Sequence, residues 1–471
     1  MTKRKSMQVR DVQGLLKRTA MGGLIGCFAF NGCLSMCVGQ ELTKANDPRT
    51  VTRLFWQDTS DQSLQCGDMV RMGTEWTIKK HAVSGLAKLD AGKQSMVQMA
   101  AANGVVFAGI HDNDNGNLQS GWIAVNAGVT EEEHGNHSHW HFDKEPSVLA
   151  SQLDANQGNP AHIYEYQGEI FVANDKKNGF TILSPSTLLR SRSSASSRFV
   201  SAGGGHITLA AVDKKVCYAT WADRDGDNKG RVDVVGLIGS ASKSGYTVHL
   251  PSGGLHGATS NSGKVFFAPS DGVIWVQADV ALGKKPKEVE INHLSLGEDA
   301  TTGKPLRTGA FENHNQYVLF TTGSADTSTL CLIDAKSAKP TLVKLSIPIE
   351  SGLALTTPKC VSTGPSGKDY AFLFSDRRGS EIAESVYIVD LDPNNDGNYF
   401  DAKVAKCIPV GTSKIEGHGG HHEVCFVPGH RLAVITNPGD GSIWAISLTD
   451  LEVQVKVQVS GEPTRIVAVG G

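Results

Sequence analysis

The sequence lacks an excess of charge of either sign, since 45 basic residues stand against 48 acidic ones and the formal net charge is -3. A protein that binds nucleic acid through its phosphates needs a concentration of basic residues on one face. The even balance does not supply one. We therefore expect no nucleic-acid partner.

Motifs of common catalytic and metal centres are also missing. The sequence contains no Gly-x-Ser-x-Gly elbow, no His-Glu-x-x-His pair and no glycine-rich phosphate loop. No two cysteines have Cys-x-x-Cys spacing, so a cysteine zinc site is not indicated. We expect the six cysteines beyond residue 39 to be small buried residues, and the sequence does not decide whether any of them form disulfides. They are Cys66, Cys217, Cys331, Cys360, Cys407 and Cys425.

Long amphipathic helical patterns are scarce, whereas glycine is plentiful at 52 residues. This balance is typical of many short strands joined by tight turns. The fold class is therefore predicted to be all-β.

The segment 1–39 has the pattern of an export signal. Basic residues up to Arg18 precede an uncharged stretch from Thr19 to Gly39, which glycines interrupt. Cleavage would leave residues 40–471 in the periplasm or otherwise outside the cytoplasm. Two alternatives stay open, a retained membrane helix and a lipoprotein anchored at Cys27.

From about Val51 a unit of short strands and polar turns recurs along the chain, which predicts a single propeller domain over residues 40–471. Seven units open near the following residues: Met96, His162, His206, His256, Thr308, Leu355 and His422. One surplus strand, Arg465 to Val469, can pair with the run around Arg53 to Trp56 and close the ring. This shared blade makes eight, with seven as the alternative.

A histidine-rich segment interrupts the repeat in an insertion at about 128–158. Four histidines and several carboxylates stand close together there, and the histidines are His134, His137, His139 and His141. Neutral imidazole is the commonest protein ligand for zinc, and short histidine-rich tracts are typical of metal sites. The cluster is thus predicted to bind Zn²⁺.

A second set of histidines is related by position in the repeat. His162, His206 and His256 open three successive units, so they should converge near one mouth of the central channel. A later unit carries His418, His421 and His422 at the matching place. Three or four of these six side chains could form a tetrahedral zinc site, and His421 is the expected fourth ligand.

The sequence resembles the AztD-type periplasmic zinc metallochaperones from about Arg53 to Gly471. The most specific pieces are Glu133-His-Gly-Asn-His137, the unit Pro160 to Glu169, Leu255-His-Gly257 and the closing segment Gly461 to Gly471. The resemblance implies a β-propeller that passes zinc to the solute-binding protein of an ABC-type zinc importer. It also implies that His162, His206 and His256 match strand-opening histidines of that family, and that His134 and His137 match its loop.

The resulting hypothesis is a periplasmic zinc-binding protein, expected to be a monomer, in which the histidine-rich loop captures the ion and the channel-mouth site holds it. It is not expected to be an enzyme. Two other functions stay open: a metal-dependent or quinoprotein-like propeller enzyme, and a binding or scaffold propeller without metal transfer. Imidazole also binds copper and nickel, so the spacing does not select zinc among these ions.

Overall fold

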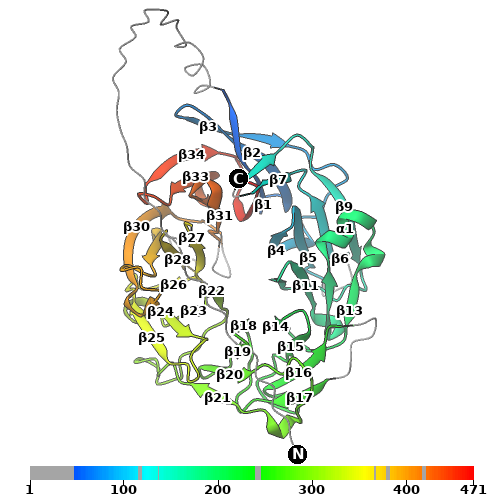
Figure 1. The fold of residues 1–471 in the computed structure, drawn as a ribbon, viewed down its shortest axis with the longest axis vertical. Helices are drawn as coiled ribbons and strands as arrows, with labels where there is room; N and C mark the ends of the chain where they lie inside the picture. The colour runs from blue at the N-terminus through cyan, green and yellow to red at the C-terminus, as the bar shows by residue number, and fades with distance from the viewer. Residues whose placement is uncertain are drawn as a thin grey trace, which may run out of the picture. The chain divides into compact units, whose positions relative to one another are not determined.

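The computed structural model describes residues 47–471 except 115–118, 136, 239–244, 365–366, 378–381 and 416–420. The predicted export segment and His418 therefore lie outside the described residues. The described strands form eight blades around a central channel, and the predicted all-β propeller is confirmed (Figure 1). Within the described ranges, no helix has the length and apolar character needed to cross a membrane.

Each blade is a small antiparallel sheet, and the first four blades have the following strands from the innermost outwards. The closing blade holds β35 (Pro463–Val469), β1 (Arg49–Asp58), β2 (Ser63–Met72) and β3 (Glu75–His81). The next holds β4 (Gln94–Ala102), β5 (Val105–Asp112), β6 (Ser120–Asn126) and β9 (Ser147–Asp154). Then follow β10 (Ile163–Tyr166), β11 (Glu169–Asn174), β12 (Gly179–Leu183) and β13 (Arg198–Val200). The fourth holds β14 (Leu209–Val212), β15 (Val216–Thr220), β16 (Arg231–Gly236) and β17 (Tyr246–His249).

The other four blades complete the ring in chain order. They begin with β18 (Ala258–Asn261), β19 (Lys264–Phe267), β20 (Val273–Gln277) and β21 (Asn292–Leu294). The next holds β22 (Glu312–His314), β23 (Tyr317–Thr322), β24 (Thr329–Asp334) and β25 (Leu342–Ser346). Two short inner strands, β26 (Leu353–Leu355) and β27 (Lys359–Ser362), then pair with β28 (Asp369–Arg377), before β29 (Glu384–Asp390) and β30 (Lys403–Gly411). The last holds β31 (Val424–Val427), β32 (Leu432–Asn437), β33 (Ser442–Ser447) and β34 (Val453–Gln458).

Two elements depart from the blade pattern. A hairpin of β7 (Thr130–His134) and β8 (His137–His141) lies between β6 and β9. Since β9 is the outer strand of its blade, only the first part of the segment 128–158 leaves the propeller. The helix α1 (Pro185–Ser191) connects β12 to β13.

The blades are held together by apolar side chains that fill the space between adjacent sheets. The middle strands are almost wholly buried, and Trp56 and Trp122 are fully enclosed. Burying large aromatic side chains in this way supplies much of the free energy of folding. Among the six described cysteines, none of which forms a disulfide, Cys407 is exposed, whereas Cys66, Cys217 and Cys331 are buried as expected.

The chain closes the ring by pairing its two ends. β35 runs antiparallel to β1, with Arg53 opposite Val469 and Trp56 opposite Ile466, as the sequence predicts. The Asp58 carboxylate accepts a hydrogen bond from the backbone N–H of Glu462 at 2.9 Å. One blade is therefore built from both ends of the propeller.

Arg53 is buried in this closing blade and connects it to the next. Its guanidinium pairs with Asp68 at 2.6 Å and donates to the carbonyl oxygens of Ala127, Phe142 and Lys144 at 2.8, 3.0 and 2.6 Å. These carbonyls lie on both sides of the β7–β8 hairpin, so Arg53 fixes its base. Gly128 is needed there, because its φ is +68° and a Cβ would lie 2.2 Å from the Lys144 carbonyl oxygen.

We expect Arg53→Met to destabilise the protein by about 3–5 kcal/mol, because the buried Asp68 carboxylate loses its guanidinium partner and keeps only its contact with His81 at 2.9 Å. Urea unfolding followed by tryptophan fluorescence measures the loss. Arg190→Met is the matched control, since Arg190 is exposed and its side chain makes one long contact with Thr187 at 3.3 Å. An equal, small effect of the two substitutions would contradict the anchoring role of Arg53.

Candidate metal site at the channel mouth

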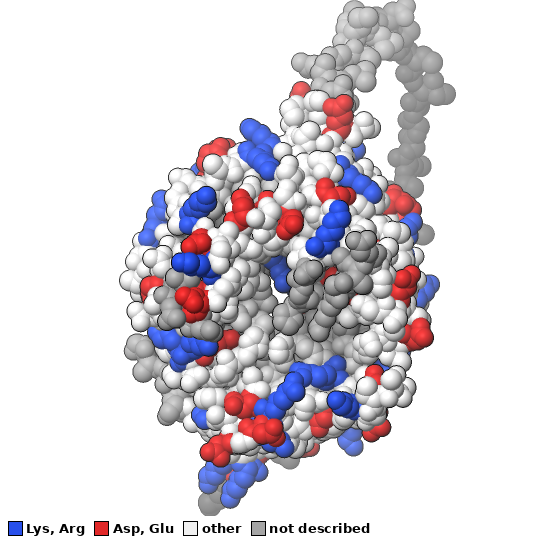
Figure 2. All heavy atoms as spheres, turned by 180° about the vertical axis from the view of Figure 1, so that it is seen from behind, with Lys and Arg blue, Asp and Glu red and all other residues white. Residues whose placement is uncertain are grey.

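The inner strands of all eight blades run in the same direction around a central cavity of about 1180 Å³. Figure 2 shows the molecule hollowed at its centre, with acidic and basic side chains intermixed over this face. Because the inner strands are aligned, residues that precede them in different blades meet at one mouth of the cavity. His162 and His256 are among the residues that line it.

The structure brings His162, His206 and His256 together at this mouth. The ring centroids are 4.6 Å apart for His162 and His206, 5.0 Å for His206 and His256, and 6.2 Å for His162 and His256. The three residues directly precede or lie just before β10, β14 and β18 in adjacent blades. We call these three side chains the triad.

Each ring of the triad is held through its Nδ1 atom. His206 Nδ1 lies 3.0 Å from an oxygen of Asp175, and His256 Nδ1 lies 3.2 Å from the carbonyl oxygen of Gly309. His162 Nδ1 lies 3.2 Å from Nε2 of Gln98. The Nε2 atoms of His162 and His206 face each other at 2.8 Å. Outer contacts of this kind fix the orientation of histidines that bind metals.

The backbone before His206 depends on small residues. Gly204 lies against Trp221, and a Cβ at Gly204 would come within 2.3 Å of the indole ring. Trp221 in turn donates its indole N–H to Asp233 at 2.7 Å. This contact sets the path of the chain that delivers His206 to the mouth.

Burial keeps two rings of the triad uncharged. Burial, together with the neighbouring rings of His206 and His256, lowers the pKa of His162 to about 3. Burial also lowers the pKa of His256. A neutral imidazole is the form that binds a metal ion, so these environments favour the ligand form at neutral pH.

As they stand, no three His, Cys, Asp or Glu side chains in the described part of the chain form a ready metal shell. The triad shows why. Two nitrogen ligands about 2.0 Å from one tetrahedral zinc are about 3.3 Å apart, whereas the facing Nε2 atoms of His162 and His206 are 2.8 Å apart and form a hydrogen bond. The rings must therefore separate by a few tenths of an ångström to hold an ion.

His421 and His422, which the sequence groups with the triad, lie across the cavity from it. They precede β31, which is on the opposite side of the ring from β14 (Figure 1). The main-chain N–H of His421 donates to Asp376 at 2.8 Å, and its ring Nε2 is buried without a hydrogen-bond partner. His421 therefore cannot complete a shell around the same ion as His206.

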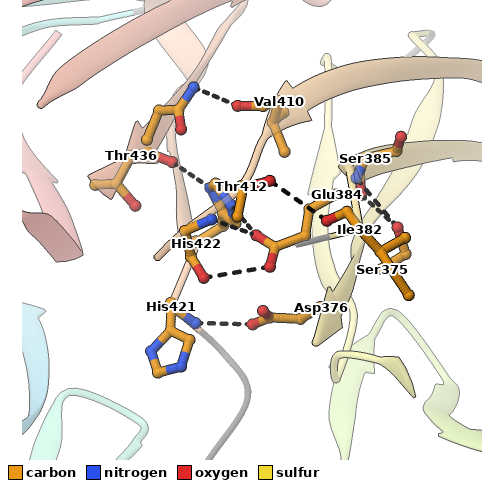
Figure 3. Close-up of polar contacts among 12 residues, drawn as sticks. Ser375, Asp376, Ile382, Glu384, Ser385, Val410, Thr412, His421, His422 and Thr436 are labelled. Atoms are coloured by element: carbon orange, nitrogen blue, oxygen red, sulfur yellow. Dashed lines mark hydrogen bonds and ion pairs between the residues drawn. The ribbon is translucent and has the colours of Figure 1, made fainter. Parts of the chain in front are cut away.

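His422 is part of a buried polar network instead. Its Nε2 lies 2.7 Å from Glu384 and its Nδ1 lies 2.9 Å from the carbonyl oxygen of Thr436 (Figure 3). Both side chains of the Glu384–His422 pair are fully buried, and Ser413 donates a backbone N–H to the same carboxylate at 2.9 Å. Because both ring nitrogens are bonded, His422 has none free for an ion.

The hairpin forms a separate histidine cluster. In its register Glu132 lies opposite His139 and Thr130 opposite His141, which places His134, Glu132, His139 and His141 on one face. Glu132 contacts His134 at 3.3 Å and His141 at 2.9 Å. These side chains are about half exposed. His137 pairs with His134 through the backbone, and its side chain lies outside the described part of the structure.

The hairpin and the triad lie at opposite ends of the propeller. The triad stands where inner strands begin, whereas the hairpin connects the third and fourth strands of a blade, at the end where inner strands finish. Gly470, which follows β35, packs against Val129 and Phe142 at the base of the hairpin. The hairpin therefore cannot touch the triad.

Gln98 and Asp175 are site residues that the sequence does not mark. Asp175 begins a short turn after β11, in a pattern that is typical of an ordinary turn. Gln98 lies in a bulge of β4, where the pairing with β5 shifts between Met96 and Met99. Such bulges redirect side chains. No local sequence signal identifies either residue as a partner of a histidine in the next blade.

We expect the metal-free protein to lose stability as the pH falls from 7 to 5, partly because of His162. Its pKa is about 3 in the folded protein and 6.5 when exposed, so the unfolded chain takes up more protons over this range. In His162→Gln, the free energy of unfolding in urea should depend less steeply on pH. An unchanged slope would show that His162 is not held neutral by burial.

Solved structures of other propellers share this fold. The structure of AztD from Citrobacter koseri aligns with a TM-score of 0.59 and 18% identity over 89% of this chain and 98% of that chain. Apo AztD from Citrobacter koseri aligns over the same shares with a TM-score of 0.58 and 18% identity. No protein-family model and no curated protein matches the sequence. At this identity the likeness shows a shared propeller fold.

Proposed function

We propose that this protein binds a zinc ion at the triad and passes it on as a periplasmic metallochaperone. The observation that carries the proposal is the meeting of three imidazoles from successive blades, with His162 and His206 in direct contact and His256 within 5.0 Å of His206. The recipient would be the solute-binding protein of an ABC-type zinc importer, as the resemblance to AztD-type proteins implies.

The chemistry of the triad fits a borderline-soft cation. Imidazole nitrogen is a preferred ligand of zinc, and burial favours the neutral form of His162 and His256. Three protein ligands leave the fourth tetrahedral position for a water molecule or a donor from another protein. An incoming ligand can therefore reach the ion from the cavity, which suits a site that gives up its metal.

The hairpin would be a separate zinc-binding site of lower affinity. Its histidines are about half exposed, and Glu132 adds a carboxylate to them. Since the hairpin and the triad are at opposite ends of the propeller, direct transfer between them by hairpin motion is not part of the proposal. The ion would reach the triad from solvent or through the central cavity.

We expect His206→Ala to weaken zinc binding at the triad by more than about 100-fold, since losing a ligand costs more than losing an outer partner, which costs 10–100-fold. Competition with a chelator of known affinity, followed by metal analysis, gives the change. His249→Ala is the matched control, because His249 is exposed, ends the outermost strand β17 of its blade, and contacts the carbonyl oxygen of Asp227 and not the triad. Failure of the native protein to bind zinc at micromolar concentrations would overturn the proposal.

We expect replacement of His134, His139 and His141 by alanine to remove one weaker zinc site and to leave the affinity of the triad unchanged. The reason is their separation by the length of the propeller. Zinc titrations of this variant and of His206→Ala should therefore lose different phases. Loss of the tight phase in the hairpin variant would show that the two clusters share one ion.

A further inference from the structure

The protons of the triad are not placed alike. A carboxylate and a backbone carbonyl can only accept hydrogen bonds. Asp175 faces Nδ1 of His206 and the Gly309 carbonyl oxygen faces Nδ1 of His256. Each neutral ring must therefore carry its proton on Nδ1, which leaves the lone pair of Nε2 free for an ion.

His162 is arranged in the opposite way. The backbone N–H of Ile163 donates to Oε1 of Gln98 at 2.7 Å, and this contact fixes the orientation of the side-chain amide. The amide nitrogen then faces Nδ1 of His162 at 3.2 Å. Because an amide NH₂ can only donate, Nδ1 of the neutral His162 must accept, and the ring carries its proton on Nε2.

One chain of hydrogen bonds results from these constraints. Gln98 donates to Nδ1 of His162, Nε2–H of His162 donates to Nε2 of His206 at 2.8 Å, and Nδ1–H of His206 donates to Asp175. Every donor meets an acceptor. The proton between the two rings lies where a shared metal ion would have to be.

We propose that Gln98 is a positioning residue that holds His162 in the tautomer unable to bind metal through Nε2, which makes zinc binding at the triad readily reversible. This inference rests on the proposed function. For His162 to bind, its Nε2 proton leaves to water and Nδ1 takes up a proton from water, so the ring stays neutral. The Gln98 amide must then turn its oxygen to Nδ1 and lose its bond with Ile163.

The contacts of Asp175 with His206 show which hydrogen bond Gln98 cannot provide to His162, namely acceptance of a hydrogen bond from Nδ1. Asp175 accepts from the Ile207 backbone N–H through Oδ1 and from the His206 ring through Oδ2, both at 3.0 Å. Gln98 holds the matching pair, Ile163 N–H and the His162 ring, in the preceding blade. The two arrangements present the same pair of partners to different terminal groups, an amide on Gln98 and a carboxylate on Asp175, and the glutamine side chain is one methylene longer. A carboxylate at position 98 would accept from both partners at once.

The test is Gln98→Glu in the full chain. Long-range ¹H–¹⁵N spectra of the metal-free protein at neutral pH should show the His162 proton on Nε2 in the native protein and on Nδ1 in the variant. Zinc affinity should rise about 10–100-fold, the range that outer partners of metal-bound histidines contribute. Gln167→Glu, which adds the same charge along the same cavity, should change neither the tautomer nor the affinity by this amount.

Three results would decide against the inference. A His162 proton on Nδ1 in the native protein would overturn it, as would an unchanged zinc affinity in Gln98→Glu. An equal gain in Gln167→Glu would overturn it too, because added charge alone would then explain the effect. If the native protein binds no zinc, the proposed function fails, and the tautomer spectra still show separately whether Gln98 directs the His162 proton.

Discussion

The pairing of β35 with β1 is the constraint on which the rest of the structure depends. It joins residues more than 400 positions apart and makes one blade from both ends of the propeller. Each blade repeats the same strand order, so the inner strands share one direction, and the closed ring gathers their starting residues at one mouth of the cavity. The triad exists only because of this convergence, and the same closure places Arg53 where it fixes the base of the histidine hairpin.

The triad is built from outer contacts as much as from its rings. Asp175 and Gly309 orient two of the imidazoles with their Nε2 lone pairs available, and Gln98 orients the third with its proton on Nε2. A site in which every histidine already had a free Nε2 lone pair would bind the metal ion tightly and release it slowly. In the proposed zinc site, one ligand in the other tautomer would lower the affinity without removing a nitrogen from the site. This arrangement is consistent with a protein whose ion is cargo.

The repeat pattern of the sequence predicts the positions of some histidines correctly and of others incorrectly. The positions of His162, His206 and His256 predict their meeting, because these residues share one phase of the repeat and open successive units. The same reasoning places His421 and His422 with them, yet their blade is on the other side of the ring and His422 is buried against Glu384. Phase along the repeat predicts the end of the propeller at which a residue lies, and it does not predict the distance around the ring.

The sequence by itself determined the all-β propeller, its closure by the two ends and the identity of the three converging histidines. The reason is that strands, turns and their repetition are recognisable from short stretches of sequence. Only the tertiary structure decided that the hairpin of His134 to His141 is at the far end from the triad. It alone decided that Gln98 and Asp175 reach the histidines of the next blade. The physical reason is that a hydrogen bond between blades depends on atomic positions set by the packing of whole sheets, which no neighbouring residue encodes.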